Sequence, residues 1–191
     1  MNIFYLDHDV RKCAEMHNNK HVVKMILEYA QLLSTAHRII DGVLSVGVGP
    51  SGRKKNVYVL ADHRNTILYS TTHVNHPSAI WVRQSDANYM WLAELLEECC
   101  REYTYRYDKV HKVEREGLMQ TLKNEFPHNI PHGTFTEPTP AMPEDAKVLC
   151  EIHTDRYQLD SLASYRNYYI QNKAHLANWK KRDVPAWYVT K

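Results

Sequence analysis

The chain has 191 residues, a length typical of one domain, and 43% of them are hydrophobic, which is enough for a core. Its 24 lysines and arginines against 22 aspartates and glutamates leave a net charge of +2. This excludes a protein that binds polyanions through its overall charge alone. Four cysteines without a CxxC pair predict reduced, mostly buried thiols, and no apolar run approaches the ~20 residues of a membrane span. We therefore expect one soluble, cytoplasmic domain over residues 1–191, without a secretory signal.

The N-terminal third predicts an extended arm, a long helix and a loop. Residues 2–6 form a short apolar run that is typical of a strand or an extended arm. From Val10 to Ile40 the apolar spacing predicts one continuous helix, and Asp41-Gly42 supplies its end. Residues 43–56 are rich in glycine and end in a basic cluster, which predicts a mobile loop, and residues 57–72 favour a helix.

The remainder of the chain predicts further helices and a long irregular segment. Residues 73–77 form a turn, a short helical piece follows, and Ser85 caps a long helix. Residues 112–125 predict another helix, residues 126–147 hold five prolines and predict an extended loop, and a last helix runs from about 161 to 180. The expected fold is mainly α: a compact helical bundle with a short N-terminal extended segment and long irregular loops.

A narrow polar stripe marks the first long helix. At ~100° per residue its members fall within roughly 60° of one line, and most other directions of the helix are apolar. Such a helix is largely buried, and burying charged groups is costly unless they are paired or line a wet pocket. The stripe therefore predicts the working site of an enzyme, formed by His17, Lys20, His21, Lys24, Glu28, Gln31 and Thr35.

Two other interpretations of the stripe remain open. Lys24 and Glu28 are four residues apart and could form a purely structural ion pair. His17 and His21 have the same spacing and could bind a metal, but the sequence is HNNKH rather than HExxH and offers no identifiable third ligand. We expect neither a metal nor a cofactor.

Two further groups of residues suit a nucleic acid or a nucleotide. The turn and helix start at 73–89 gather polar side chains beside free backbone amides, which suits a phosphate, although a capped helix over a core tryptophan explains them equally. Aromatic and basic residues alternate at 103–107 and 165–169 and in the tail, which suits stacked bases or, alternatively, helix packing. The candidate binding residues are His73, His76, Arg83, Ser85, Asn88, Arg106, Tyr165, Arg166 and Trp187.

Three short patterns resemble the phage-type pyrimidine-dimer DNA glycosylase/AP lyases. His21 and Glu28 have the spacing of the histidine and the catalytic glutamate in that family, and the segment Glu94–Cys99 is similar to its Glu-Leu-x-x-Glu-Cys sequence. Trp187-Tyr188 is similar to its Trp-Tyr tail. The resemblance implies a compact helical domain in which an amine attacks the sugar C1′ of a damaged pyrimidine nucleotide, with Glu28 stabilising the cationic sugar and moving protons.

The resemblance gives each residue of the stripe an expected role. Glu28 would be catalytic together with His21. The attacking amine would be that of Met1 or Lys24, or else that of Lys20. If Lys20 is not the nucleophile, it would contact the substrate together with His17 and Gln31. The partner would be DNA. The alternatives are an enzyme that processes a nucleotide or a modified base on a related helical scaffold, and a non-catalytic nucleotide-binding protein.

Overall fold

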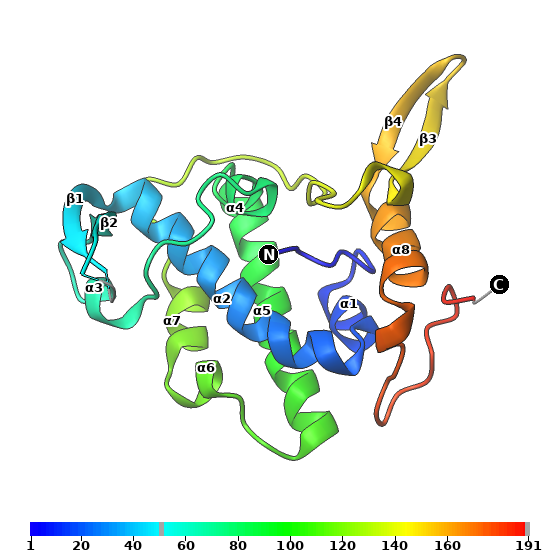
Figure 1. Cartoon of the computed structure of the whole chain (residues 1–191), viewed down its shortest axis with the longest axis horizontal. Coiled ribbons are helices and arrows are strands. Elements are labelled where there is room, and N and C mark those ends of the chain that lie inside the picture. Colours follow the sequence, from blue (N-terminus) through cyan, green and yellow to red (C-terminus); the bar gives the residue numbers. More distant parts are fainter. Residues whose placement is uncertain (50–51, 190–191) are drawn as a thin grey trace.

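The structure is mainly helical, as predicted, and it also contains two small antiparallel sheets that the sequence analysis does not predict. The computed structural model describes residues 1–49 and 52–189. Figure 1 shows two long helices, α2 and α5, at the centre of the molecule and one β-hairpin towards each end. The helical body therefore carries the core, and the hairpins project from it.

The first predicted helix is in fact two helices, so the prediction of one continuous helix is wrong. Helix α1 spans Val10–Met16 and α2 spans Asn19–Asp41. His17 and Asn18 between them have extended backbone, and the Asn18 side chain accepts a hydrogen bond from the His21 N–H at 2.9 Å. Asparagine is a favoured N-cap residue, so a new helix starts here although the apolar spacing continues.

Helix α5 (Asp86–Tyr107) begins where predicted, because the Ser85 side chain caps it by accepting the Asn88 N–H. Helices α1 and α2 both pack against α5, and the short helix α4 (Pro77–Val82) packs against α2. The N-terminal arm adds four consecutive core residues, Ile3 to Leu6, none more than 4% exposed. The core is thus a two-helix centre closed by an extended arm.

The β-hairpin at residues 43–59 replaces segments that were expected to be loop and helix. Strands β1 (Val43–Val48) and β2 (Lys54–Val59) pair antiparallel, with Val43 opposite Val59 and Val48 opposite Lys54. The mobile loop predicted for 43–56 is therefore wrong for its described residues; Pro50 and Ser51 lie outside them. The helix predicted for 57–72 is also wrong, since only α3 (Arg64–Ile67) is helical there.

The C-terminal half is more broken than predicted. The helix expected at 112–125 is split into α6 (Lys112–Arg115) and α7 (Leu118–Asn124) by Gly117, whose φ of +80° ends the first turn. Residues 126–147 are irregular as predicted, apart from the 3-10 turn η1 (Glu144–Ala146). Strands β3 (Val148–His153) and β4 (Arg156–Asp160) precede α8 (Ser161–Asn172), which is followed by the turn η2 (Ala174–Leu176).

The cysteines agree with the expectation of mostly buried thiols. Cys13, Cys99 and Cys100 are buried free thiols, and Cys150 is half-buried in β3. Among the described residues, every helix is too short or too polar to cross a membrane.

Candidate active site around Met1, Glu28 and His76

The N-terminal arm holds Met1 at a defined place on the helical body. The Tyr29 hydroxyl accepts the Phe4 N–H at 3.3 Å, and the Cys13 thiol donates to the Phe4 carbonyl at 3.2 Å. The Phe4 ring stacks on the His21 ring with 4.1 Å between centroids. Met1 itself packs against the hydrophobic core. Such an arm fixes the position of the α-amine at its start.

Glu28 lies in the middle of α2 and forms an ion pair with Lys24, one turn earlier. The Lys24 Nζ to Glu28 Oε1 distance is 3.0 Å. The Glu28 side chain is only 13% exposed, whereas that of Lys24 is 65% exposed. The pair confirms the predicted contact between the two residues, but it does not decide between a structural and a catalytic role. The small exposed part of Glu28 is what a substrate could reach.

His76 lies within electrostatic range of both Glu28 and the N-terminal amine. It is the N-cap of α4, where its Nδ1 accepts the Ser78 N–H at 3.2 Å. The pKa of His76 is lowered, first by burial and then by the positive charges of the α-amine and His73, while Glu28 raises it. The amine and Glu28 therefore both lie within electrostatic range of this ring.

The ring of His76 is neutral near pH 7 because its pKa is lowered, and its protonated nitrogen is then Nε2 because Nδ1 is an acceptor. A primary amine and a carboxylate thus both lie within electrostatic range of an imidazole N–H. These groups can supply a nucleophile, a proton acceptor and a hydrogen-bond donor.

Cationic side chains lie near the first half of α2, before Glu28. The pKa of His21 is lowered to about 3 by burial and then by nearby positive groups, among which are Lys173 after α8, Lys24 and His175. Lys20 is exposed one turn before Lys24. These charges would attract an anionic substrate to the surface next to Glu28.

His21 has a different place from the one expected. It is 5% exposed, its Nδ1 is 2.6 Å from the Tyr169 hydroxyl, and its ring lies against Phe4. The pKa near 3 keeps the ring uncharged at neutral pH. His21 therefore supports the arm that carries Met1, and the catalytic role expected for it becomes a positioning role.

Three predicted binding residues are buried and already have protein partners. His17 uses both ring nitrogens, with the Cys13 carbonyl at 2.7 Å and the Tyr29 hydroxyl at 2.8 Å, which also removes the basis for a metal site with His21. Arg106 pairs with Glu102, and the Tyr165 hydroxyl donates to the Thr139 carbonyl. These three side chains hold the fold together and are not available to a substrate.

The phosphate site expected at the start of α5 is already filled. The Asp86 carboxylate accepts the Ala87 N–H at 2.8 Å and the Gly133 N–H at 3.0 Å, so a second anion would be repelled. Arg83 donates to two backbone carbonyls and Ser85 to the Thr134 carbonyl. Asn88 is 1% exposed and hydrogen-bonds within the protein.

Arg166 and Trp187 fasten the two ends of the chain to α8. The Arg166 Nε donates to the Leu6 carbonyl at 2.9 Å, and its guanidinium lies 5.4 Å from the Trp187 ring. The Trp187 N–H contacts the Met16 sulfur. Both residues therefore have structural contacts. His73 and Gln31 are the other predicted residues near the site, His73 beside His76 and Gln31 half-buried one turn after Glu28.

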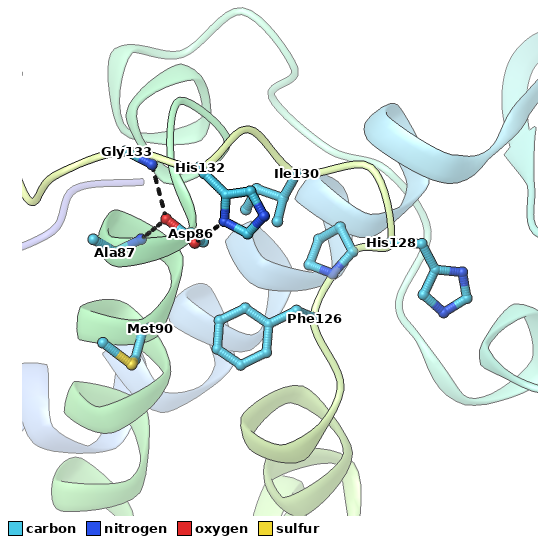
Figure 2. A pocket seen from close by; sticks show the side chains of 9 residues that line it. Asp86, Ala87, Met90, Phe126, His128, Ile130, His132 and Gly133 are labelled. Atoms are coloured by element: carbon cyan, nitrogen blue, oxygen red, sulfur yellow. Dashed lines mark hydrogen bonds and ion pairs between the residues drawn. The ribbon is translucent and has the colours of Figure 1, made fainter.

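A separate cavity of about 600 Å³ opens beside the start of α5. Figure 2 shows His132 and Ile130 on one side of it and Phe126 on the other, with Met90 beside them. His132 Nδ1 is 2.7 Å from the Asp86 carboxylate, which leaves the other ring nitrogen free. An apolar cavity with one polar pair suits a small planar ligand.

Sequence reasoning did not identify His132 or Tyr169. His132 lies in the proline-rich segment and meets Asp86 only through the fold. Tyr169 was read as part of an aromatic cluster, and its contact with His21 spans 148 residues of sequence. No local sequence pattern predicts the contact of His132 with Asp86 or that of Tyr169 with His21.

Comparison of the chain with known protein families, with curated proteins and with solved structures found no match. Among the residues that the structure describes, no three His, Cys, Asp or Glu side chains are grouped so that they could hold a metal ion. The function must therefore be argued from the chemistry of the site.

Proposed function

We propose that the protein is a DNA glycosylase with AP lyase activity that acts on a damaged or modified pyrimidine. The observation that carries this proposal is that the arm starting at Met1 is anchored to α2, the helix that carries Glu28, by the Phe4 N–H to Tyr29 hydroxyl bond and by the stacking of Phe4 on His21. The lowered pKa of His76 agrees with this placement, because the α-amine lowers it and Glu28 raises it. An amine and a carboxylate at one accessible place are the two groups that imine-forming base excision requires.

In the proposed reaction the amine nitrogen of Met1 bonds to the sugar C1′ as the C1′–N bond to the base breaks. The base leaves with its electron pair, stabilised by a hydrogen bond from the His76 Nε2–H, and takes up the proton that the attacking amine must lose. Loss of the amine proton and opening of the sugar give an imine. Glu28 then removes a C2′ proton, and the 3′ C–O bond breaks by β-elimination.

Met1 is a better candidate for the nucleophile than Lys24. The Lys24 nitrogen is 3.0 Å from the Glu28 carboxylate, and an ammonium in such a pair has no free electron pair. An α-amine in general has a pKa of about 7.7–8.0 and is partly unprotonated near neutrality. Lys24 would instead orient Glu28 and, with Lys20 and Lys173, attract the phosphate backbone.

Borohydride trapping on duplex DNA that contains an abasic site or a thymine dimer tests the proposal. We expect a covalent adduct with wild-type protein, located on Met1 by peptide mass spectrometry after intact mass confirms that Met1 is retained. Lys24→Arg keeps the ion pair but removes the primary amine, so it should still be trapped. Extending the N-terminus by two residues moves the amine and should abolish trapping. No adduct and no cleavage with either DNA would refute the lyase activity.

Glu28→Gln separates an enzyme from a binding protein. The amide keeps the shape and most of the packing but loses the negative charge, so an enzyme would retain its fold and DNA affinity and lose about 100-fold or more in turnover. A variant with unchanged turnover would contradict a catalytic Glu28.

The cavity at the start of α5 favours one alternative, a protein that binds a nucleoside or modified base. It offers apolar walls and two histidines, His128 and His132, but no lysine or arginine for a phosphate among its lining residues. A thermal-shift comparison of nucleosides with duplex DNA separates the two functions. Stabilisation by a nucleoside that His132→Ala removes, without any effect of DNA, would decide for the alternative.

A further inference from the structure

The β1–β2 hairpin exposes more apolar surface than a solvated element needs. Val43, Val46 and Val48 are 72%, 68% and 70% exposed, and Leu44 and Val59 are exposed as well. A two-stranded hairpin is marginally stable in water by itself, and clusters of exposed apolar side chains usually mark a surface that meets a partner. The hairpin is therefore a candidate interaction surface.

The charge of the hairpin indicates the kind of partner. Its described residues, 43–49 and 52–59, include Arg53, Lys54 and Lys55, all exposed, and no acidic residue. Lys54 pairs with Val48 and Lys55 with Gly47, so neighbouring positions along β2 put the two lysines on opposite faces of the ribbon. A ribbon with three adjacent basic residues at one end and exposed apolar side chains along its strands fits the major groove of a nucleic acid duplex, which admits a two-stranded β-ribbon.

The second hairpin of the molecule, β3–β4, does not share the basic charge of β1–β2. Strands β3 and β4 also project from the body and expose Leu149, Ile152 and Tyr157. Residues 148–160, however, hold three acidic residues and one arginine, so their charge is negative. The two hairpins share a shape but differ in charge.

The base of β1–β2 is held firmly. Arg38 donates to the Tyr58 carbonyl at 2.9 Å and to the Leu68 carbonyl at 2.7 Å. Gly42 at the start of β1 also bonds to the Arg38 carbonyl through its N–H. These bonds fix the hairpin to the end of α2, so it can act as an arm of defined direction.

Helix α2 also sets the distance between the arm and the candidate active site. The 13 residues from Glu28 to Asp41 span about 20 Å at 1.5 Å per residue. At 3.4 Å per base pair, 20 Å is about six base pairs of duplex.

We propose that β1–β2 is a DNA-binding arm, whose base lies about six base pairs of duplex from the nucleotide at Glu28 and whose basic end contacts the groove. Arg53, Lys54 and Lys55 contact phosphates on either side of the groove, and Val46 and Val48, on the same face as Lys54, pack against the groove. The spacing rests on the proposed function, whereas the contact between the arm and DNA does not.

Salt-dependent DNA binding by full-length protein tests the arm. We compare wild type with a variant in which Arg53, Lys54 and Lys55 are all replaced by Gln, on a 30-base-pair duplex with a central abasic site. Each lost phosphate contact should lower the salt slope by about 0.9. Between 50 and 200 mM salt the wild type should therefore lose about 40-fold more affinity than the triple variant.

A pair of single variants gives the matched control. Lys54→Gln should reduce the slope by about 0.9, while Arg156→Gln on the other hairpin should leave it unchanged. Shortening the duplex beside the abasic site from eight to three base pairs should lower the affinity of the wild type and leave the affinity of the triple variant unchanged. Equal thermal unfolding curves would confirm that the variants are folded.

The possible outcomes separate the arm from the catalytic proposal. Equal salt slopes for wild type and the triple variant, or no binding of wild type to any duplex, would overturn the arm. A wild-type slope that depends on the arm, without a trapped imine, would overturn only the catalytic proposal. Self-association in sedimentation that the triple variant abolishes, with unchanged DNA binding, would reassign the hairpin to contacts between copies.

Discussion

Three histidines buried without charge should make the protein sensitive to mild acid. The pKa of His17 is lowered to about 4, that of His21 to about 3 and that of His37 to about 4, in each case mainly by burial. His37 accepts a hydrogen bond from Arg64 and contacts the Tyr89 hydroxyl at 2.7 Å, so its neutral form is also the bonded one.

The sign of the effect follows from proton binding. In the unfolded chain a histidine has a pKa of about 6.5, so between pH 6.5 and about 4 the unfolded state binds a proton that the folded state does not. Stability is therefore present above pH 6.5 and is lost as the pH falls. Each histidine contributes about 1.4 kcal/mol per pH unit, or about 2 kcal/mol between pH 6.5 and 5. Three give about 6 kcal/mol, a large share of a typical 5–15 kcal/mol.

Urea unfolding at pH 7, 6 and 5, followed by circular dichroism, measures this loss. The slope of the unfolding free energy against pH should correspond to about three protons between pH 6 and 5. The substitution His17→Gln should remove one of these protons, whereas replacing the exposed His153 by Gln should leave the slope unchanged. Asp41 and Asp62 have pKa values lowered by their contacts with Arg64, so their contribution is lost only below about pH 4, outside this window. A slope below one proton would refute the buried, neutral state of these histidines.

Two substitutions test the parts that support the site and the arm. Phe4→Ala removes the ring that stacks on His21. We expect it to lower the unfolding free energy by about 3–5 kcal/mol and to slow imine trapping by the protein that remains folded. The core control Leu92→Ala should lower the unfolding free energy without slowing imine trapping by the folded protein. Equal trapping by the folded Phe4→Ala variant would contradict a positioning role of the N-terminal arm. Gly42→Ala puts a Cβ against the Arg38 carbonyl oxygen and should cost about 1–3 kcal/mol; an unchanged midpoint in urea unfolding would show that the hairpin base yields easily.

Local signals predicted the elements that local interactions determine. Ser85 marked the start of α5 because a cap is a contact over three residues. The break at Asn18 was missed although asparagine is a capping residue, because the apolar spacing continues across it. The glycines of 43–49 suggested a loop, whereas the alternation of valines was the stronger signal, and pairing with residues 54–59 decided the structure.

The same distinction applies to the candidate site. The stripe singled out Glu28 and Lys24 because both face outward from one helix, and their ion pair lies within that helix. The stripe also included His17 and His21, because helical periodicity shows which face of the helix a side chain lies on but not which other segment of the chain covers that face. The N-terminal arm and α8 cover those two histidines, and the positions of these two segments cannot be predicted from the sequence of α2 alone.

Burial thus divides the stripe into two functions that depend on each other. The histidines lose their charge and hold the arm through Phe4 and Tyr29, which determines where Met1 lies. Glu28 keeps a small exposed part, and the amine reaches its neighbourhood only if the arm stays in place. Acid that protonates the buried histidines should therefore reduce imine formation before the protein unfolds, in addition to the direct protonation of the amine. In the proposed reaction this uncharged support matters, because a charged histidine beneath Phe4 would repel both a protonated amine and the cationic sugar that the reaction would form.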